Sequence, residues 1–285
     1  MTHATSLANS LEFRICHSMD GGTGYGRTSY RAFASVCALL LATSAALTIA
    51  WCASMSRTGG MPMPGGWTMS MVWMRMPGQR WAGATASFVG MWVVMMMAMM
   101  LPSLVPTLWR YRQAVFGTNE TRRGLLTTLV GLGYFFVWTL FGLALFPFGV
   151  SLAALEMERP PLARAVPGAV AVVVLIAGVI QFTSWKAHHL AGCCEAPGRG
   201  RSLPSDAGTA WRQGIRFGLH CGLSCANLTA VLLVLGVMDL RAMAAVTAAI
   251  TAERLAPARL HVARATGAVV IGLALFLMVR AVGLG

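Results

Sequence analysis

The sequence predicts an all-α protein, a polytopic transmembrane helical bundle of about six to seven spans. Of the 285 residues, 56% are hydrophobic and only 11% are charged, whereas about a quarter of the residues in a soluble globular protein are charged. The mean hydropathy is +0.66. Apolar stretches long enough to cross a bilayer recur along the whole chain, so we expect a bundle of membrane helices and not a soluble domain with one anchor.

Two segments precede the main bundle. Residues 1–30 are polar, rich in glycine and without a hydrophobic period, so we expect a disordered N-terminal segment. Residues 31–53 are apolar over the length of one span. Trp51 and Cys52, at the end of this stretch, do not fit the small-residue cleavage site of a signal peptide. We therefore predict that residues 31–53 are the first transmembrane helix.

Residues 54–81 form a Met-rich segment whose glycines and prolines exclude a continuous helix. Two interpretations are open. Thioether sulfur is a soft ligand that suits Cu(I), and methionines at M-P-M and M-S-M spacing are unusual in an ordinary loop. Alternatively, the tryptophans and methionines rest on the membrane surface as an interfacial loop. The methionines are Met55, Met61, Met63, Met69, Met71, Met74 and Met76.

The main bundle, residues 82–285, begins with a second span at about 82–109 that contains the run MWVVMMMAMMLPSLVP. Pro102 and Pro106 are predicted to kink or end this helix. Methionine is an adaptable packing residue, so for this run taken alone we favour helix contact over a cofactor site. At helical spacing the methionines fall on two adjoining stripes, formed by Met91, Met95 and Met99 and by Met96 and Met100.

The later spans are predicted from further apolar runs of suitable length. A near-neutral loop is expected at residues 151–168, where two glutamates offset two arginines. The predicted third and fourth spans are 125–150 and 169–185, the fifth is 215–237, a short sixth is 238–252, and the seventh is 262–282.

The net charge of +13 does not indicate nucleic-acid binding, because there is no concentrated basic face and no recognisable binding fold. The basic residues lie instead in short loops between spans. The loops after the second, fourth and sixth spans are basic, which by the positive-inside rule places them in the cytoplasm. We therefore predict a multi-pass protein of the bacterial inner membrane with a cytoplasmic N-terminus and an extracytoplasmic Met-rich loop.

Cysteine and histidine residues form two pairs at helical spacing. The seven cysteines have no regular spacing, so they are not a disulfide framework. Cys221 and Cys225 are four residues apart and share a helix face, as His189 and Cys193 would. The predicted topology brings both pairs to the cytoplasmic side, where three cysteines and a histidine suit zinc and added methionine favours Cu(I). The candidate metal ligands are Cys221, Cys225, Cys193, His189, His220, Met96, Met99 and Met100.

Other polar and sulfur residues have simpler expected roles. Lys186 either extends to the interface or supplies a charge near the site. Glu253 is expected to pair with Arg254 or Arg216, and Cys52 to pack as a small hydrophobic residue. No phosphate-binding glycine loop, nucleophile elbow or zincin helix is present. Hydrolase and kinase functions are therefore disfavoured.

Three stretches together resemble the bacterial family catalogued as domain of unknown function 2182, described as predicted metal-binding integral membrane proteins. The likeness covers most of residues 82–280. The family typically has a cysteine at the position of His189 and a vicinal cysteine pair where this chain has Ser224 and Cys225. The resemblance implies metal binding with altered ligands. The stretches are MWVVMMMAMMLPSLVP at 91–106, AGVIQFTSWKAHHLAGCCEAP at 177–197, and GLHCGLSCANLTAVLLVLGVMDL through ERLAP at 218–257.

The predicted function is copper or zinc handling or delivery by an integral membrane protein, through a Cys/His site near the cytoplasmic face. A role other than catalysis is favoured. The expected partners are the lipid bilayer and other metal-handling membrane or periplasmic proteins. Two alternatives remain open: a membrane thiol-disulfide oxidoreductase that uses Cys221 and Cys225, and a non-catalytic assembly subunit of a membrane complex.

Overall fold

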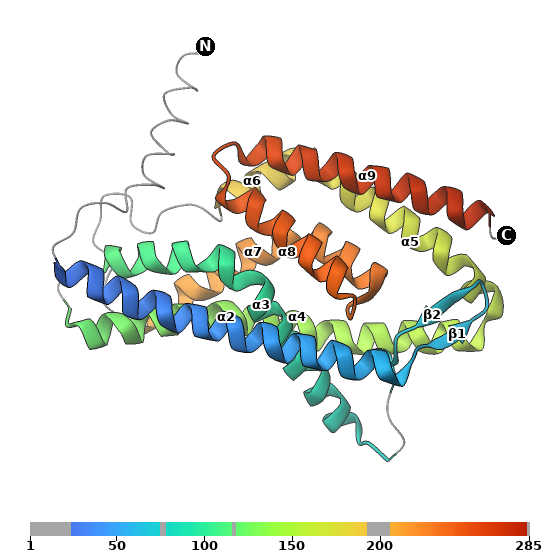
Figure 1. Ribbon diagram of the computed structural model, residues 1–285, viewed down its shortest axis with the longest axis horizontal. Helices are drawn as coiled ribbons and strands as arrows, with labels where there is room; N and C mark the ends of the chain where they lie inside the picture. Colours follow the sequence, from blue (N-terminus) through green and yellow to red (C-terminus); the bar gives the residue numbers. More distant parts are fainter. Residues whose placement is uncertain (1–23, 75–77, 116–117, 193–205, 284–285) are drawn as a thin grey trace, which may run out of the picture.

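The computed structural model describes residues 24–74, 78–115, 118–192 and 206–283. Within these ranges the chain folds as eight helices and one short strand pair, which confirms the predicted all-α class (Figure 1). The helices are α2 (Gly24–Thr58), α3 (Trp81–Ala114), α4 (Glu120–Glu158), α5 (Pro160–Ile180), α6 (Ser184–Gly192), α7 (Ala207–Gly236), α8 (Leu240–Leu255) and α9 (Arg259–Gly283).

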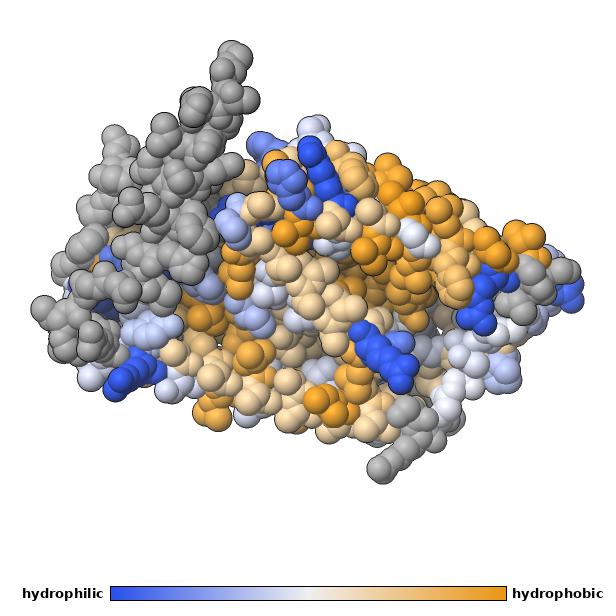
Figure 2. Space-filling view, turned by 45° about the horizontal axis from the view of Figure 1, so that its top comes forward, coloured by the Kyte–Doolittle hydropathy of each residue, from blue (hydrophilic) through white to orange (hydrophobic). Residues whose placement is uncertain are grey.

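Six of these helices, α2, α3, α4, α5, α7 and α9, are long and apolar enough to cross a membrane. Hydrophobic side chains cover most of the face seen in Figure 2, as expected for a surface that contacts lipid acyl chains. Helix α8 has only 16 residues, a length of about 24 Å at 1.5 Å per residue. The six long helices indicate a multi-pass membrane protein, and the predicted sixth span is a shorter helix.

The Met-rich segment folds as a small hairpin. Strand β1 (Met61–Met63) pairs antiparallel with β2 (Trp67–Met69), and a 3-10 helix follows at Met71–Trp73. Gly65 and Gly66 turn the chain between the strands with φ of +107° and +74°, a backbone region that side chains with a Cβ rarely adopt. The indole Nε1 of Trp67 donates to the carbonyl of Ala163 at 2.8 Å, so the hairpin is held against the start of α5.

The starts of α5 and α7 differ from the prediction. The loop expected at residues 151–168 is helical except at Arg159, because α5 begins directly after it with prolines in its first turn, where proline is well tolerated. Helix α3 continues through Pro102 and Pro106 and bends, as Figure 1 shows, which is one of the two predicted outcomes. Helix α7 begins at Ala207, about two turns before the expected start, because the Asp206 carboxylate caps it by accepting from the Thr209 amide.

Glycines allow α4 and α7 to pack backbone against backbone. A Cβ at Gly214 of α7 would lie 2.3 Å from the carbonyl oxygen of Val130, and one at Gly133 of α4 would lie 2.7 Å from that of Trp211. Small residues commonly permit such close contact between membrane helices. This contact fixes the position of α7, which carries the two predicted cysteine ligands, against α4.

We expect Gly214→Ala to lower the free energy of unfolding by about 1–3 kcal/mol, the usual cost of overpacking a well-packed interior. The added methyl group cannot be accommodated without moving α7 away from α4. Unfolding by SDS titration of the purified protein in mild detergent measures this change. Gly131→Ala on α4 is the control, because a Cβ there meets nothing within 4 Å. Equal losses in both variants would contradict the close-packing argument.

Candidate metal centre

A buried cluster of sulfur atoms lies between α3 and α7. The exposed fractions of Met100, Cys221 and Cys225 are 0%, 1% and 2%. The Cys221 thiol lies 3.9 Å from the Met100 thioether sulfur, and the Tyr134 hydroxyl of α4 lies 2.7 Å from the Cys221 sulfur. Both cysteines are free thiols. Because four residues separate them, the two cysteines share one face of α7, as predicted, and both thiols point into the core.

Arg254 of α8 connects this cluster to its neighbours. Its guanidinium donates to the Cys225 sulfur at 3.4 Å and to the Ser224 hydroxyl at 3.1 Å. The other terminal nitrogen donates to the Ser103 hydroxyl of α3 at 3.2 Å. Since the side chain is buried, a single cation holds three helices around the Cys225 thiol.

A buried ion pair lies next to this arginine. The Lys186 ammonium is 2.7 Å from a Glu253 carboxylate oxygen, with side-chain exposures of 1% and 2%. Lys186 also donates to the Ser224 carbonyl at 2.6 Å, and the Gln181 amide donates to the other Glu253 oxygen at 2.8 Å. The lysine therefore supplies a charge inside the core and does not extend to the interface. Glu253 forms this ion pair with Lys186, a partner that the sequence did not suggest.

The buried side chains around the cysteines have a net positive charge. Lys186 and Arg254 contribute two positive charges and Glu253 one negative charge, all within the buried core. A cysteine binds metal as a thiolate, and an uncompensated charge in a low-dielectric interior is strongly unfavourable. The excess positive charge offsets the negative charge that a metal-bound thiolate brings into the core.

The donor atoms of the cluster are soft. Among the residues that the structure describes, no three His, Cys, Asp or Glu side chains come together at one metal position. Two thiols and a thioether are groups of the kind that Cu(I) favours, and thiolates also bind zinc.

Not every predicted ligand joins the sulfur cluster. Met96 and Met99 are buried in the same core with exposures of 0% and 3%, while Met100 is the methionine that contacts a predicted thiol. Cys193 lies outside the described residues. His189 and His220 are half-buried and face each other, with ring centroids 6.2 Å apart.

The histidine pair lies on a different face of α7 from the thiols, since His220 precedes Cys221 by one position, or about 100° around the helix. Within the described part of the chain, the Nδ1 atoms of His189 and His220 are buried without a hydrogen-bond partner. Partial burial lowers the pKa of the His189 imidazole, and His188 and His220 lower that pKa further. The neutral form that results is the form that binds metals.

The depth of the thiol cluster differs from the prediction. Cys221 lies about half-way along α7, because that helix starts at Ala207 and not near residue 215. At 1.5 Å per residue, the cysteine is about 21 Å from the helix start. The thiols are therefore in the interior of the bundle, and the histidine pair sits on the neighbouring face of α7 beside α6.

Three residues that surround the thiols could not be predicted, or only in part, from the sequence. Tyr134 gave no signal, because one tyrosine in an aromatic-rich span is typical of a packing residue. Ser103 was likewise inconspicuous. Arg254 carried a usable signal, because an ionisable residue within a membrane bundle is a functional candidate by default. Its contact with Cys225 depends on the packing of α8 against α7, which no local pattern encodes.

The fold and the cluster together define a class: multi-pass helical proteins with a buried set of thiol and thioether groups. Residues 89–277 match the family described as PpoB2, copper chaperone. This match covers more than half of the chain, and the protein belongs to this family. The match supports a copper-related family, and it does not carry the label of domain of unknown function 2182. No curated protein and no solved structure matches the chain.

We expect Tyr134→Phe to weaken Cu(I) binding about 10–100-fold, the usual effect of removing a hydrogen-bond partner of a metal ligand. The substitution removes the 2.7 Å contact to Cys221 and leaves the ring in place. Competition with a Cu(I) chelator in mild detergent measures the affinity. Thr139→Val on the same helix is the control, because its hydroxyl only donates to the Phe135 carbonyl. Equal affinity in wild type and Tyr134→Phe would contradict a role for the hydroxyl.

Proposed function

We propose that the protein binds Cu(I) at Cys221, Cys225 and Met100 and delivers it to other copper-handling proteins. The single observation that carries the proposal is the buried thiol pair, with a thioether on one side and an excess positive charge on the other. Membership of a family described as a copper chaperone supports the choice of metal. The donor chemistry supports Cu(I) over zinc.

The second part of the proposal concerns delivery. A copper chaperone must release its ion to a partner, and the thiols are too deeply buried to be reached directly. His189 of α6 and His220 of α7, with ring centroids 6.2 Å apart, supply further metal-binding groups. The candidate ligand Cys193 lies outside the described residues. In the proposed topology this end faces the cytoplasm of a bacterium, with the protein in the inner membrane. The proposed receiving partner is another metal-handling membrane protein, one that can be reached from this cytoplasmic end.

An anaerobic Cu(I) titration of purified protein in mild detergent tests the binding site. We expect Cys221→Ala/Cys225→Ala to lose one equivalent of tightly bound Cu(I), and Cys221→Ser/Cys225→Ser, which keeps the side-chain size, to lose the same. Cys37→Ala on α2 is the matched control, because this free cysteine is only partly buried. An unchanged copper content in both double variants would contradict the proposal and favour a thiol oxidoreductase or an assembly subunit.

A further inference from the structure

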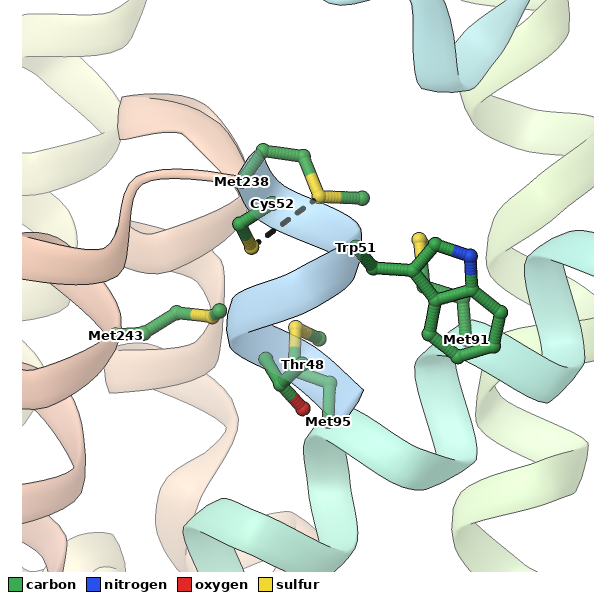
Figure 3. A pocket seen from close by; sticks show the side chains of 7 residues that line it. All are labelled: Thr48, Trp51, Cys52, Met91, Met95, Met238 and Met243. Carbon is green, nitrogen blue, oxygen red and sulfur yellow. Dashed lines mark hydrogen bonds between the residues drawn. The ribbon is translucent and has the colours of Figure 1, made fainter. Parts of the chain in front are cut away.

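A second group of sulfur side chains surrounds a small cavity between α2, α3 and the connection from α7 to α8 (Figure 3). This group shares no residue with the Cys221 cluster. Five of the seven lining residues carry sulfur, one as a thiol and four as thioethers. The lining residues are Thr48, Trp51, Cys52, Met91, Met95, Met238 and Met243.

Two of the sulfur atoms that line this cavity are in contact. The Cys52 thiol is 3.7 Å from the Met238 thioether sulfur, and Figure 3 shows Met95 and Met243 pointing toward the space beside them. Cys52, Met95 and Met243 have exposures of 4%, 2% and 5%. The cavity volume is about 10 Å³, roughly the room that one water-sized particle occupies. The space therefore suits a single ion and is too small for an organic ligand.

The lining residues of the cavity differ in burial. Met238 is half-buried and Trp51 is 40% exposed, while the remaining sulfur-bearing residues around the space are buried. The lining otherwise offers apolar surface and one hydroxyl, and that hydroxyl, of Thr48, donates to the Ser44 carbonyl. The chemistry of the lining favours a soft cation and disfavours a hard one such as Mg²⁺.

Methionines on α3 connect this cavity to the Cys221 cluster. Met95 lines the cavity, and Met99 and Met100 follow it by four and five residues, about 6–8 Å along the helix axis. All three are buried in one continuous core with both cysteine groups. Met99, which forms no described contact with the predicted thiols, thus lies between two groups of soft ligands.

We propose that Cys52, Met238, Met95 and Met243 form a second Cu(I) site, which loads copper toward Cys221 and Cys225 along the α3 methionines. Its loading role rests on the proposed function, whereas its ability to bind Cu(I) does not. Cys52 is on α2, outside the residues 89–277 that match the copper chaperone family. This chain therefore completes the site with a ligand from outside the matched region.

Packing is the alternative explanation, because methionine and buried cysteine both serve as ordinary core residues. The two explanations differ in what replacement does. A packing role is preserved by volume-conserving replacement such as Met238→Leu, whereas a ligand role is abolished. Cys52→Ala/Met238→Leu removes the two sulfurs that are in contact and leaves the Cys221 cluster unchanged.

The experiment is an anaerobic Cu(I) titration of the full chain in mild detergent against a chromogenic Cu(I) chelator. Two separate thiol-containing sites would each hold one Cu(I) ion. We therefore expect about two equivalents in wild type and about one in either Cys52→Ala/Met238→Leu or Cys221→Ala/Cys225→Ala. No copper is expected when all four residues are replaced. Elution as a single species in size-exclusion chromatography checks folding, and Cys52→Ser/Met238→Leu provides a second variant of similar size.

The outcomes separate this inference from the proposed function. Wild-type stoichiometry and affinity in both Cys52 variants would overturn the second site and leave the Cys221 site standing. Loss of one equivalent in the Cys52 variants, with no loss in Cys221→Ala/Cys225→Ala, would support the second site and reject the central one. No copper retained by wild type would reject both.

Discussion

Glu253→Gln is expected to lower the free energy of unfolding by about 3–5 kcal/mol, the largest effect on stability in this set. The glutamine keeps the size of the side chain but leaves Lys186 and Arg254 as positive charges in a core where the Lys186 side chain is only 1% exposed. Removing one partner of a buried ion pair is unfavourable because the other charge stays uncompensated. Unfolding by SDS titration, followed by tryptophan fluorescence, measures the change.

Two further variants show whether a loss of stability in Glu253→Gln comes from the ion pair. Lys186→Met/Glu253→Gln removes the charged pair together, and we expect it to recover most of the loss, since replacing both buried charges is often close to neutral. Glu158→Gln, at the exposed end of α4, is the control for a glutamate replacement. Wild-type stability in Glu253→Gln would show that the ion pair is not formed in the membrane protein.

Cys225→Ser is expected to lower Cu(I) affinity by more than about 100-fold, beyond the 10–100-fold typical of residues that only support a ligand. The replacement exchanges a soft sulfur for a hard oxygen and leaves the positive charge of Arg254 without the thiolate that balances it on metal binding. Chelator competition in detergent measures the affinity.

Arg254→Gln gives the comparison for this result. The glutamine side chain keeps a neutral hydrogen-bond donor but removes the charge beside Cys225, so we expect a loss of about 10–100-fold. If Arg254→Gln weakened binding more than Cys225→Ser did, Cys225 would be a supporting residue and not a ligand.

The helical periodicity of the sequence predicted the parts of the site that depend on local spacing. Cys221 and Cys225 share a face because one helical turn separates them, and the structure turns both toward the core. The six long helices likewise follow from the length of the apolar runs. The predicted ends of the helices were less accurate. For example, capping by Asp206 extends α7 beyond its apolar stretch.

Contacts between residues far apart in the chain could not be predicted in this way. Cys52 contacts Met238, which is 186 positions away in the chain, whereas Cys52 was expected only to pack as a small hydrophobic residue. Tyr134 reaches Cys221 from another helix. These contacts depend on how the helices pack, which glycines such as Gly214 control through close backbone approach. A single sequence shows that such glycines are present but not which helices they bring together.

The most direct test of the account is X-ray absorption spectroscopy at the copper edge of Cu(I)-loaded Cys52→Ala/Met238→Leu, in which the central site alone holds copper. We expect a copper environment described by sulfur ligands only, and loss of that signal when Cys221 and Cys225 are also replaced by alanine. A copper ion bound by nitrogen or oxygen, or a sulfur signal that survives the loss of both cysteines, would contradict it.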